Sequence, residues 1–170
     1  MLFFCAASEE RTFTPLDSEC AGGQVEQITQ NICDIHSINS FFMACKTGQE
    51  NLVQISLEEG ANVNLRINDG FTPLYIACKS GHKGTAQLLL ANGADINLQT
   101  IDGCTPLYIA CQNGHDGTAQ LLLANGADVN LQTIDGCTPL YIACQNGHDG
   151  TAQLLLAKGA DVNLQNMKMC

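Results

Sequence analysis

The hydrophobic and polar positions of this chain repeat with a period of 33 residues. Within one period, an apolar segment from Leu107 to Cys111 follows a threonine and a proline, which suit the cap and the first position of a helix. A second segment, from His115 to Ala124, follows a glycine, the residue that commonly ends a helix. The pattern predicts two short helices per period. Because neither is long enough to be stable alone in water, we expect the pairs to stack around a shared core.

The segment between successive helix pairs is polar and carries the Asp-Gly sequence of a tight turn between extended arms. Residues 100–132 and 133–165 differ at one position, where Asn125 is replaced by Lys158. The expected helix pairs lie near Ser40–Glu59, Thr72–Asn92, Thr105–Asn125 and Thr138–Lys158.

The recurring sequences Thr-Pro-Leu-Tyr-Ile-Ala, Gly-His, Leu-Leu-Leu and Gly-Ala-Asp-Val-Asn resemble ankyrin repeats over roughly Ser37 to Gln165. The resemblance implies a mainly α protein, an α-solenoid of stacked helix-loop-helix units with β-hairpin fingers. Three tyrosines replace the usual histidine of the Thr-Pro-Leu-His motif, a departure that affects packing more than fold. They are Tyr75, Tyr108 and Tyr141.

The repeats suggest a division of the chain. Apolar residues of one helical period, such as Val25 and Ile32, precede the first repeat, which lacks the Thr-Pro start. We expect a poorly ordered segment at 1–23, a capping helix at 24–36, a degenerate first repeat at 37–66, ankyrin repeats at 67–99, 100–132 and 133–165, and a C-terminal tail without a cap at 166–170. The outer face of the last repeat carries residues suited to meet another repeat. Further repeats, a partner, or self-association through this uncapped repeat would each cover that face.

Composition limits the classes of partner and the cellular locations that we expect. The net charge of −10 argues against nucleic acid and against an anionic membrane surface as the main partner. The apolar stretch Met1–Ala7 is too short for a secretory signal and has no basic start, and no apolar run approaches the roughly 20 residues of a membrane helix. We therefore expect a cytoplasmic protein, with the nucleus not excluded.

Six of the ten cysteines recur at two positions of the repeat, so their spacing does not indicate a secreted disulfide scaffold. Stacked helices lie about 8–10 Å apart, whereas a disulfide requires Cα atoms closer than about 7 Å. The cysteines that recur at one position of the first helix are expected to be buried, because buried cysteine behaves as a small apolar residue. They are Cys45, Cys78, Cys111 and Cys144.

No catalytic or metal-binding motif is found. Cysteine and histidine do not occur at the short spacings of structural zinc sites, so we expect neither a metal nor a cofactor. Tyr108, Cys111 and His115 could compose a catalytic site, but each recurs every 33 residues, which favours a scaffold role. We expect His115 to tie its loop to the neighbouring repeat and the protein not to be an enzyme.

The resemblance implies a concave binding face built from finger tips, the exposed part of the first helix and the loop after it. Carried over, this face comprises Asn68, Asp69, Phe71, Lys79, Ser80, Ile101, Asp102, Cys104, Gln112, Asn113, Ile134, Asp135, Cys137, Gln145 and Asn146. Residues 67–99 differ from the next repeat at seven positions, four of them on this face. Either a partner has tuned these positions or loop positions drift freely. Phe71 is a candidate anchor, and the aspartates in register, such as Asp102, favour a basic partner.

Three asparagines follow Asp and Val or Ile, with a leucine eight residues earlier: Asn97, Asn130 and Asn163. This pattern resembles ankyrin sites that a cytosolic asparaginyl hydroxylase modifies. The alternative is that these side chains only brace the hairpin.

Two functions remain open. One is a non-catalytic protein-protein interaction module, an adaptor or scaffold that binds a protein on its concave face. The other is an ankyrin segment of a larger enzyme, channel or ubiquitin-ligase substrate receptor whose activity lies outside these residues.

Overall fold

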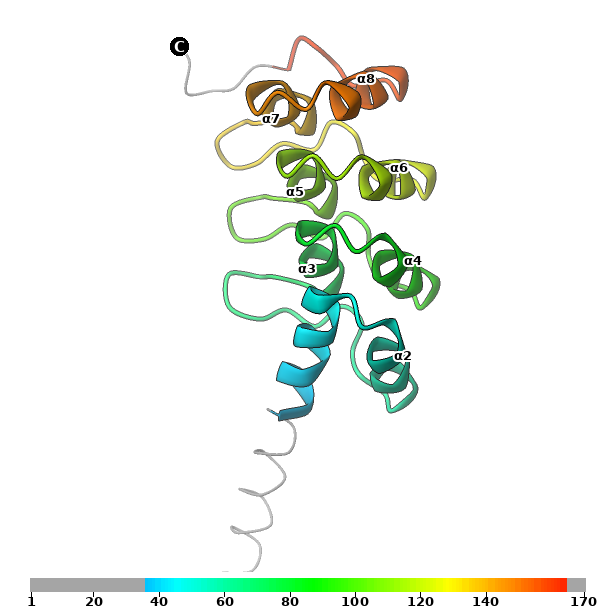
Figure 1. Ribbon diagram of the computed structural model, residues 1–170. Coiled ribbons are helices and arrows are strands. Elements are labelled where there is room, and N and C mark those ends of the chain that lie inside the picture. Colours follow the sequence, from blue (N-terminus) through cyan, green and yellow to red (C-terminus); the bar gives the residue numbers. More distant parts are fainter. Residues whose placement is uncertain (1–35, 165–170) are drawn as a thin grey trace, which may run out of the picture. The chain divides into compact units, whose positions relative to one another are not determined.

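A computed structural model describes residues 36–164 (Figure 1). The described repeats belong to one compact unit, which begins at Ser37. The expectations for residues 1–23, for the capping helix up to residue 35 and for the tail at 166–170 lie outside the described residues.

The described residues form pairs of antiparallel helices, one pair per repeat. The first pair consists of a helix over residues 36–47 and α2 (Glu50–Glu58). The others are α3 (Pro73–Lys79) with α4 (Lys83–Ala91), α5 (Pro106–Gln112) with α6 (Asp116–Ala124), and α7 (Pro139–Gln145) with α8 (Asp149–Ala157). These ranges confirm the four expected pairs.

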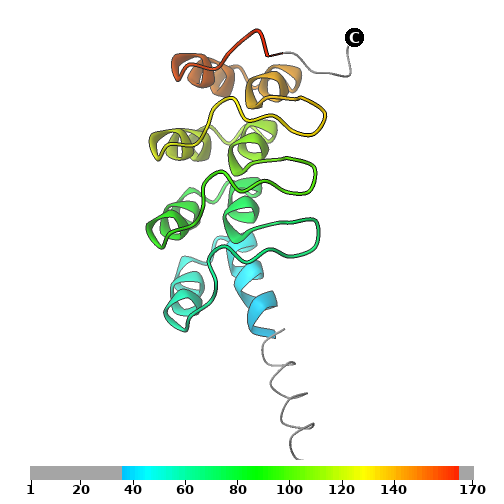
Figure 2. The ribbon, with the colours of Figure 1, turned by 180° about the vertical axis from the view of Figure 1, so that it is seen from behind.

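The pairs stack in two layers. The first helices α3, α5 and α7 form one layer, and α2, α4, α6 and α8 form the other (Figure 1). The loops between pairs project to one side of the stack (Figure 2). We call these loops the fingers; the first two span residues 65–71 and 98–104 and the third spans residues 131–137.

Side-chain caps begin the first helices where the sequence predicts them. The Thr72 Oγ1 accepts a hydrogen bond from the Tyr75 N–H at 3.1 Å, and Thr105 and Thr138 do the same for Tyr108 and Tyr141. Each cap satisfies one of the backbone donors that a helix start leaves unpaired, and the proline that follows has no N–H to satisfy.

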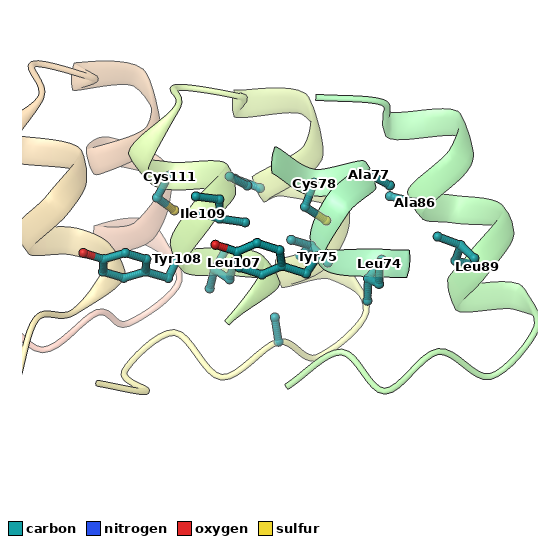
Figure 3. Packing of buried hydrophobic residues seen from close by; sticks show 14 of the residues in the cluster. Leu74, Tyr75, Ala77, Cys78, Ala86, Leu89, Leu107, Tyr108, Ile109 and Cys111 are labelled. Carbon is teal, nitrogen blue, oxygen red and sulfur yellow. The ribbon is translucent and has the colours of Figure 1, made fainter. Parts of the chain in front are cut away.

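The core runs along the stack between the two layers (Figure 3). Leu74 and Leu107 occupy one register of the first helices and are 1% exposed, while Leu89 on α4 is fully buried. Burying one leucine side chain stabilises the fold by about 1.5–3 kcal/mol. Small residues such as Ala77 and Cys78 let the two layers approach closely.

The prediction that all four register cysteines are buried is wrong for the last of them. Cys45, Cys78 and Cys111 are 0% exposed, whereas Cys144 is exposed. The cause is stacking, because α7 covers Cys111 and no described residue takes that place over Cys144. Leu156 and Val162 on the same face are 49% and 69% exposed.

This difference predicts unequal reactivity toward iodoacetamide in the folded protein. Cys144 should be alkylated rapidly, and Cys111 only when the stack opens. Residues 102–115 and 135–148 have the same sequence, so peptides cannot distinguish the two sites and variants are required. By intact mass, Cys144→Ala should remove a rapidly added label and Cys111→Ala should not. Loss of the same rapid label in both variants would contradict the exposure difference.

A second prediction concerns threonines at the start of the outer helices. Thr85 is fully buried, and its Oγ1 has no hydrogen-bond partner among the described residues. In the same register, the Thr151 hydroxyl donates to the Asp116 carboxylate. A buried hydroxyl without a partner costs about 1–3 kcal/mol, whereas a bond to a charged group contributes about 1.5–3 kcal/mol. Thr85→Val should therefore leave the free energy of unfolding unchanged or raise it, and Thr151→Val should lower it, as measured by urea denaturation. Equal losses in the two variants would show that Thr85 has a partner.

Candidate protein-binding surface

Histidines fix the loops between paired helices to the preceding repeat. The Nε2 of His82 lies 3.0 Å from the Lys46 carbonyl oxygen, and His115 and His148 make the same contact with Lys79 and Gln112, at 3.2 and 3.1 Å. Because a carbonyl only accepts, the Nε2 carries the proton and donates it. These contacts confirm the expected role of His115 in tying its loop to its neighbour.

Two residues predicted for partner binding share this structural role. The side-chain amides of Asn113 and Asn146 donate to the carbonyls of Lys79 and Gln112, at 2.9 and 2.8 Å. The carbonyls of Lys79 and Gln112, the last residues of α3 and α5, thus each receive two donors from the next repeat. The sequence could not separate this use of an exposed asparagine from contact with a partner.

Hydrogen bonds between neighbours align the fingers. The Ile101 N–H donates to the Asp69 carbonyl at 2.9 Å, and the Ile134 N–H to the Asp102 carbonyl at 3.0 Å. The Gln99 side chain donates to the Gly103 carbonyl of its own finger at 2.9 Å and to the Gln132 carbonyl of the next at 3.0 Å. The fingers are therefore preorganised as a row, which lowers the entropic cost of binding a partner there.

We call the fifteen residues predicted for partner binding the finger–loop surface. None of them is fully buried. The exposed members are Asn68, Asp69, Lys79, Ile101, Asp102, Asn113, Ile134, Gln145 and Asn146. The half-buried members are Phe71, Ser80, Cys104, Gln112, Asp135 and Cys137.

The Phe71 side chain packs against two neighbouring side chains and does not project freely from the finger. Its ring stacks on Tyr75, with centroids 5.0 Å apart and an interplanar angle of 19°. The Lys79 Nζ lies 5.8 Å from the Phe71 ring centroid, within the range of a cation–π contact. The three side chains form a rigid cluster at the base of the first full finger. Removing Phe71 would therefore also cost some stability.

At the finger tips, Ile101 and Ile134 are 66% and 70% exposed. Exposed apolar side chains that adjoin one another mark interaction surfaces, whereas single ones are common on any protein.

Tyr75, a buried residue of α3, has a raised pKa. Burial, and then the nearby Cys104 and Asp102, raise the pKa of Tyr75 to about 12.

The pKa of Cys104 is also raised, chiefly by burial, with the Asp102 and Asp135 carboxylates adding to the effect and a hydrogen bond with Thr100 opposing it. A thiol whose pKa is raised is a poor nucleophile at neutral pH. Cys104 is therefore a poor candidate for a nucleophile.

Part of the surface was not predicted from the sequence. The helix over residues 36–47 contributes Met43, 54% exposed, and Lys46, both of which line cavities next to Ile76 on α3. This helix lacks the Thr-Pro start, so its exposed face was not aligned with the others. The signal that could have found it is register, because Lys46 lies 33 positions before Lys79.

Two of the three candidate hydroxylation sites hold the next repeat by a hydrogen bond. The Oδ1 of Asn97 accepts the Asp128 N–H of the next repeat at 3.0 Å, and Asn130 does the same for Asp161 at 2.9 Å. Asn163 is exposed, and its side chain donates to Asp161 within its own loop. The bracing role is thus observed for the first two, and hydroxylation of any of them remains a prediction.

A rigid stack of helix pairs that presents a row of fingers defines a helical-repeat solenoid. The family model described as "Ankyrin repeats (3 copies)" matches residues 18–100 and 92–166. The chain belongs to the ankyrin repeat family. Members are generally protein–protein interaction modules and typically non-catalytic. No curated protein matches the chain. Among the described helices, none has both the length and the apolar character needed to cross a bilayer.

Proposed function

We propose that the protein is a non-catalytic adaptor or scaffold that binds a protein partner on the finger–loop surface, the concave face of its family. The observation that carries the proposal is the row of rigid fingers with Ile101 and Ile134 exposed at their tips and the Phe71 cluster at their base. Such a surface offers apolar anchors and polar groups in fixed positions, as protein interfaces require.

The finger aspartates favour a basic segment of the partner. Asp69 and Asp102 are exposed, and Asp135 follows in the same register. Each also shapes its Asp-Gly turn, with Gly70 and Gly103 in the left-handed region at φ +86° and +78°. If the carboxylates also contact the partner, binding should weaken as salt concentration rises.

Replacing Phe71 tests this proposal. With a partner captured by affinity purification, Phe71→Ala should weaken binding by about 1–3 kcal/mol in a titration, because aromatic anchors dominate interface energies. Gln87→Ala on α4 should leave affinity unchanged, since Gln87 is exposed on the outer layer. Phe71→Cys is a fold-compatible companion, because cysteine occupies this register in the next two repeats. Equal affinities of the wild type, both Phe71 variants and Gln87→Ala would place the binding site elsewhere.

The exposed end of the last described repeat supports self-association as a second candidate. Leu140, Tyr141, Leu156 and Val162 surround a cavity of about 330 Å³ there. Sedimentation velocity at increasing concentration should detect a dimer or larger species, and Leu156→Glu should abolish it. A monomer at all concentrations would remove this candidate and leave the finger–loop proposal standing.

The alternative is that these repeats are the docking segment of a larger enzyme, channel or ubiquitin-ligase substrate receptor. In both proposals the repeats bind a protein partner. The alternative differs because it assigns the activity to residues outside this chain. Sequencing the complete gene and transcript distinguishes the two.

A further inference from the structure

Two adjoining cavities form a groove where the first helix pair meets the second. One, of about 280 Å³, is lined mainly by apolar side chains, among them Phe42, Met43 and Ile67. The other, of about 520 Å³, extends past Lys79 toward the loop after α5. Lys46 and Ile76 line both cavities. We call this feature the lysine groove, defined by Phe42, Met43, Lys46, Ile67, Ile76 and Lys79.

Comparison between repeats shows that the groove is a local departure from an otherwise regular stack. Ile76 is half-buried, whereas Ile109 and Ile142 in the same register are 5% and 6% exposed. Ile76 therefore stays accessible at a position where the equivalent isoleucines of the later repeats are buried. An apolar group of a partner entering at this point would gain the burial that the stack itself supplies elsewhere.

The charges of the groove also differ from those of the later repeats. Lys46 and Lys79 occupy one register, in which the third and fourth repeats carry Gln112 and Gln145. Both lysines are exposed, and within residues 36–164 neither forms an ion pair with a carboxylate. Lys79 is held by its contact with the Phe71 ring, at 5.8 Å. In a chain of net charge −10, two such ammonium groups beside an apolar cavity form a distinct local site.

From these observations we infer that the lysine groove binds a partner segment in which a carboxylate adjoins one or two apolar side chains. The apolar side chains fill the cavity beside Met43 and Ile76, and the carboxylate lies between Lys46 and Lys79. The inference rests on the proposed function, because it assigns the chemistry of the partner at one end of the finger–loop surface.

The inference also gives the partner an orientation. Asp102 and Asp135 belong to later fingers than the groove, whereas Asp69 lies on the finger that also carries Ile67 of the groove, so the negative charges extend further along the stack than the two lysines. A partner segment with an acidic, apolar part and a basic part can match both only in one direction, because the reverse places like charges together.

The probe for the test is a library of random linear peptides displayed on phage, selected against the full 170-residue chain at low salt. Selected peptides should combine Asp or Glu with Leu, Ile or Phe. For a synthetic peptide of this kind, Lys46→Gln and Lys79→Gln should each weaken binding about threefold to tenfold, with the loss shrinking at high salt. Glutamine is fold-compatible, since two later repeats carry it at this position.

Lys83→Gln is the matched control, because Lys83 is an exposed lysine at the start of α4 that does not line the groove. Its affinity for the peptide should equal that of the wild type. A chain carrying both Lys46→Glu and Lys79→Glu should select basic peptides instead.

The outcomes separate the inference from the proposed function. Selected peptides that lose affinity with Phe71→Ala but not with either lysine variant would overturn the inference and leave the finger–loop surface as the binding site. The inference would also be overturned if the wild type selects basic peptides whose affinity does not change in either lysine variant. Failure to select any peptide whose binding depends on Phe71, Lys46 or Lys79 would overturn both.

Discussion

Gly114→Ala is expected to destabilise the stack by about 2–3 kcal/mol, roughly twice the loss expected for Gly147→Ala. Both glycines follow the same sequence and have left-handed backbones, with φ of +68° and +73°. Alanine pays about 1–2 kcal/mol for that conformation at either position. Only at Gly114 would the new Cβ meet a neighbouring repeat, 2.5 Å from the Nδ1 of His148, whereas nothing within 4 Å among the described residues faces Gly147.

The additional loss at Gly114 arises because the His148 ring must move. That ring donates to the Gln112 carbonyl at 3.1 Å, and a displaced ring gives up a bond worth about 0.5–1.5 kcal/mol. Urea denaturation of the two variants measures the difference. Equal losses would mean that the ring moves without cost and that the histidine contributes little to cohesion between repeats.

Alkali should unfold the protein over a narrow range of pH. Burial raises the pKa of Cys45 and Cys111 from an ordinary 9.0 to about 12, and it raises the pKa of Cys78 further. Burial is also the main cause that raises the pKa of Tyr75 and Tyr108 from 10.0 to about 12. These groups are neutral when protonated, so the folded chain holds their protons at a pH where the unfolded chain has released them.

The contribution of these groups to stability is complete below pH 9 and is lost as pH rises from 9 toward 12. Each buried thiol lowers the free energy of unfolding by about 1.4 kcal/mol per pH unit in this window, so three thiols give a slope of about 4 kcal/mol per unit. Urea denaturation in the presence of a phosphine reductant, at intervals between pH 7 and 11, measures the slope.

Cys111→Ala provides the control for the alkaline prediction. The variant should be less stable at pH 7 because of the cavity that it leaves, but its slope should be lower by the contribution of one thiol. A free energy of unfolding that stays constant up to pH 11 would show that the thiols reach solvent in the folded state.

The sequence predicted the elements of this fold well because each repeat contains its own boundary signals. Thr105, Pro106 and Gly114 start and end one helix through local chemistry that does not depend on neighbours. The period then places these local units in a stack, since each apolar face requires the next repeat. The helices could therefore be predicted because the same local motifs recur every 33 residues, although each motif alone is a weak indication of structure.

What the sequence did not predict depends on position within the stack. Cys111 and Cys144 lie in identical local sequences, yet one is buried and the other exposed, because only one has a described repeat above it. Asn113, which is predicted to contact a partner, also donates to the Lys79 carbonyl, and the sequence did not indicate that second role. The lysine groove arises where an irregular first helix meets a regular second pair, and no motif within either repeat encodes it.

The contacts between repeats also bear on how such an array can change its length. His148 and Asn146 reach the Gln112 carbonyl, and the same donors one repeat earlier reach the Lys79 carbonyl, so these side chains need from the preceding repeat a backbone oxygen, which any residue provides. A duplicated copy of residues 100–132 would find on both sides the partners it already has. In-frame duplication or loss of one 33-residue unit would therefore keep the polar contacts and the apolar faces between repeats matched, and the resulting chain should fold without compensating substitutions.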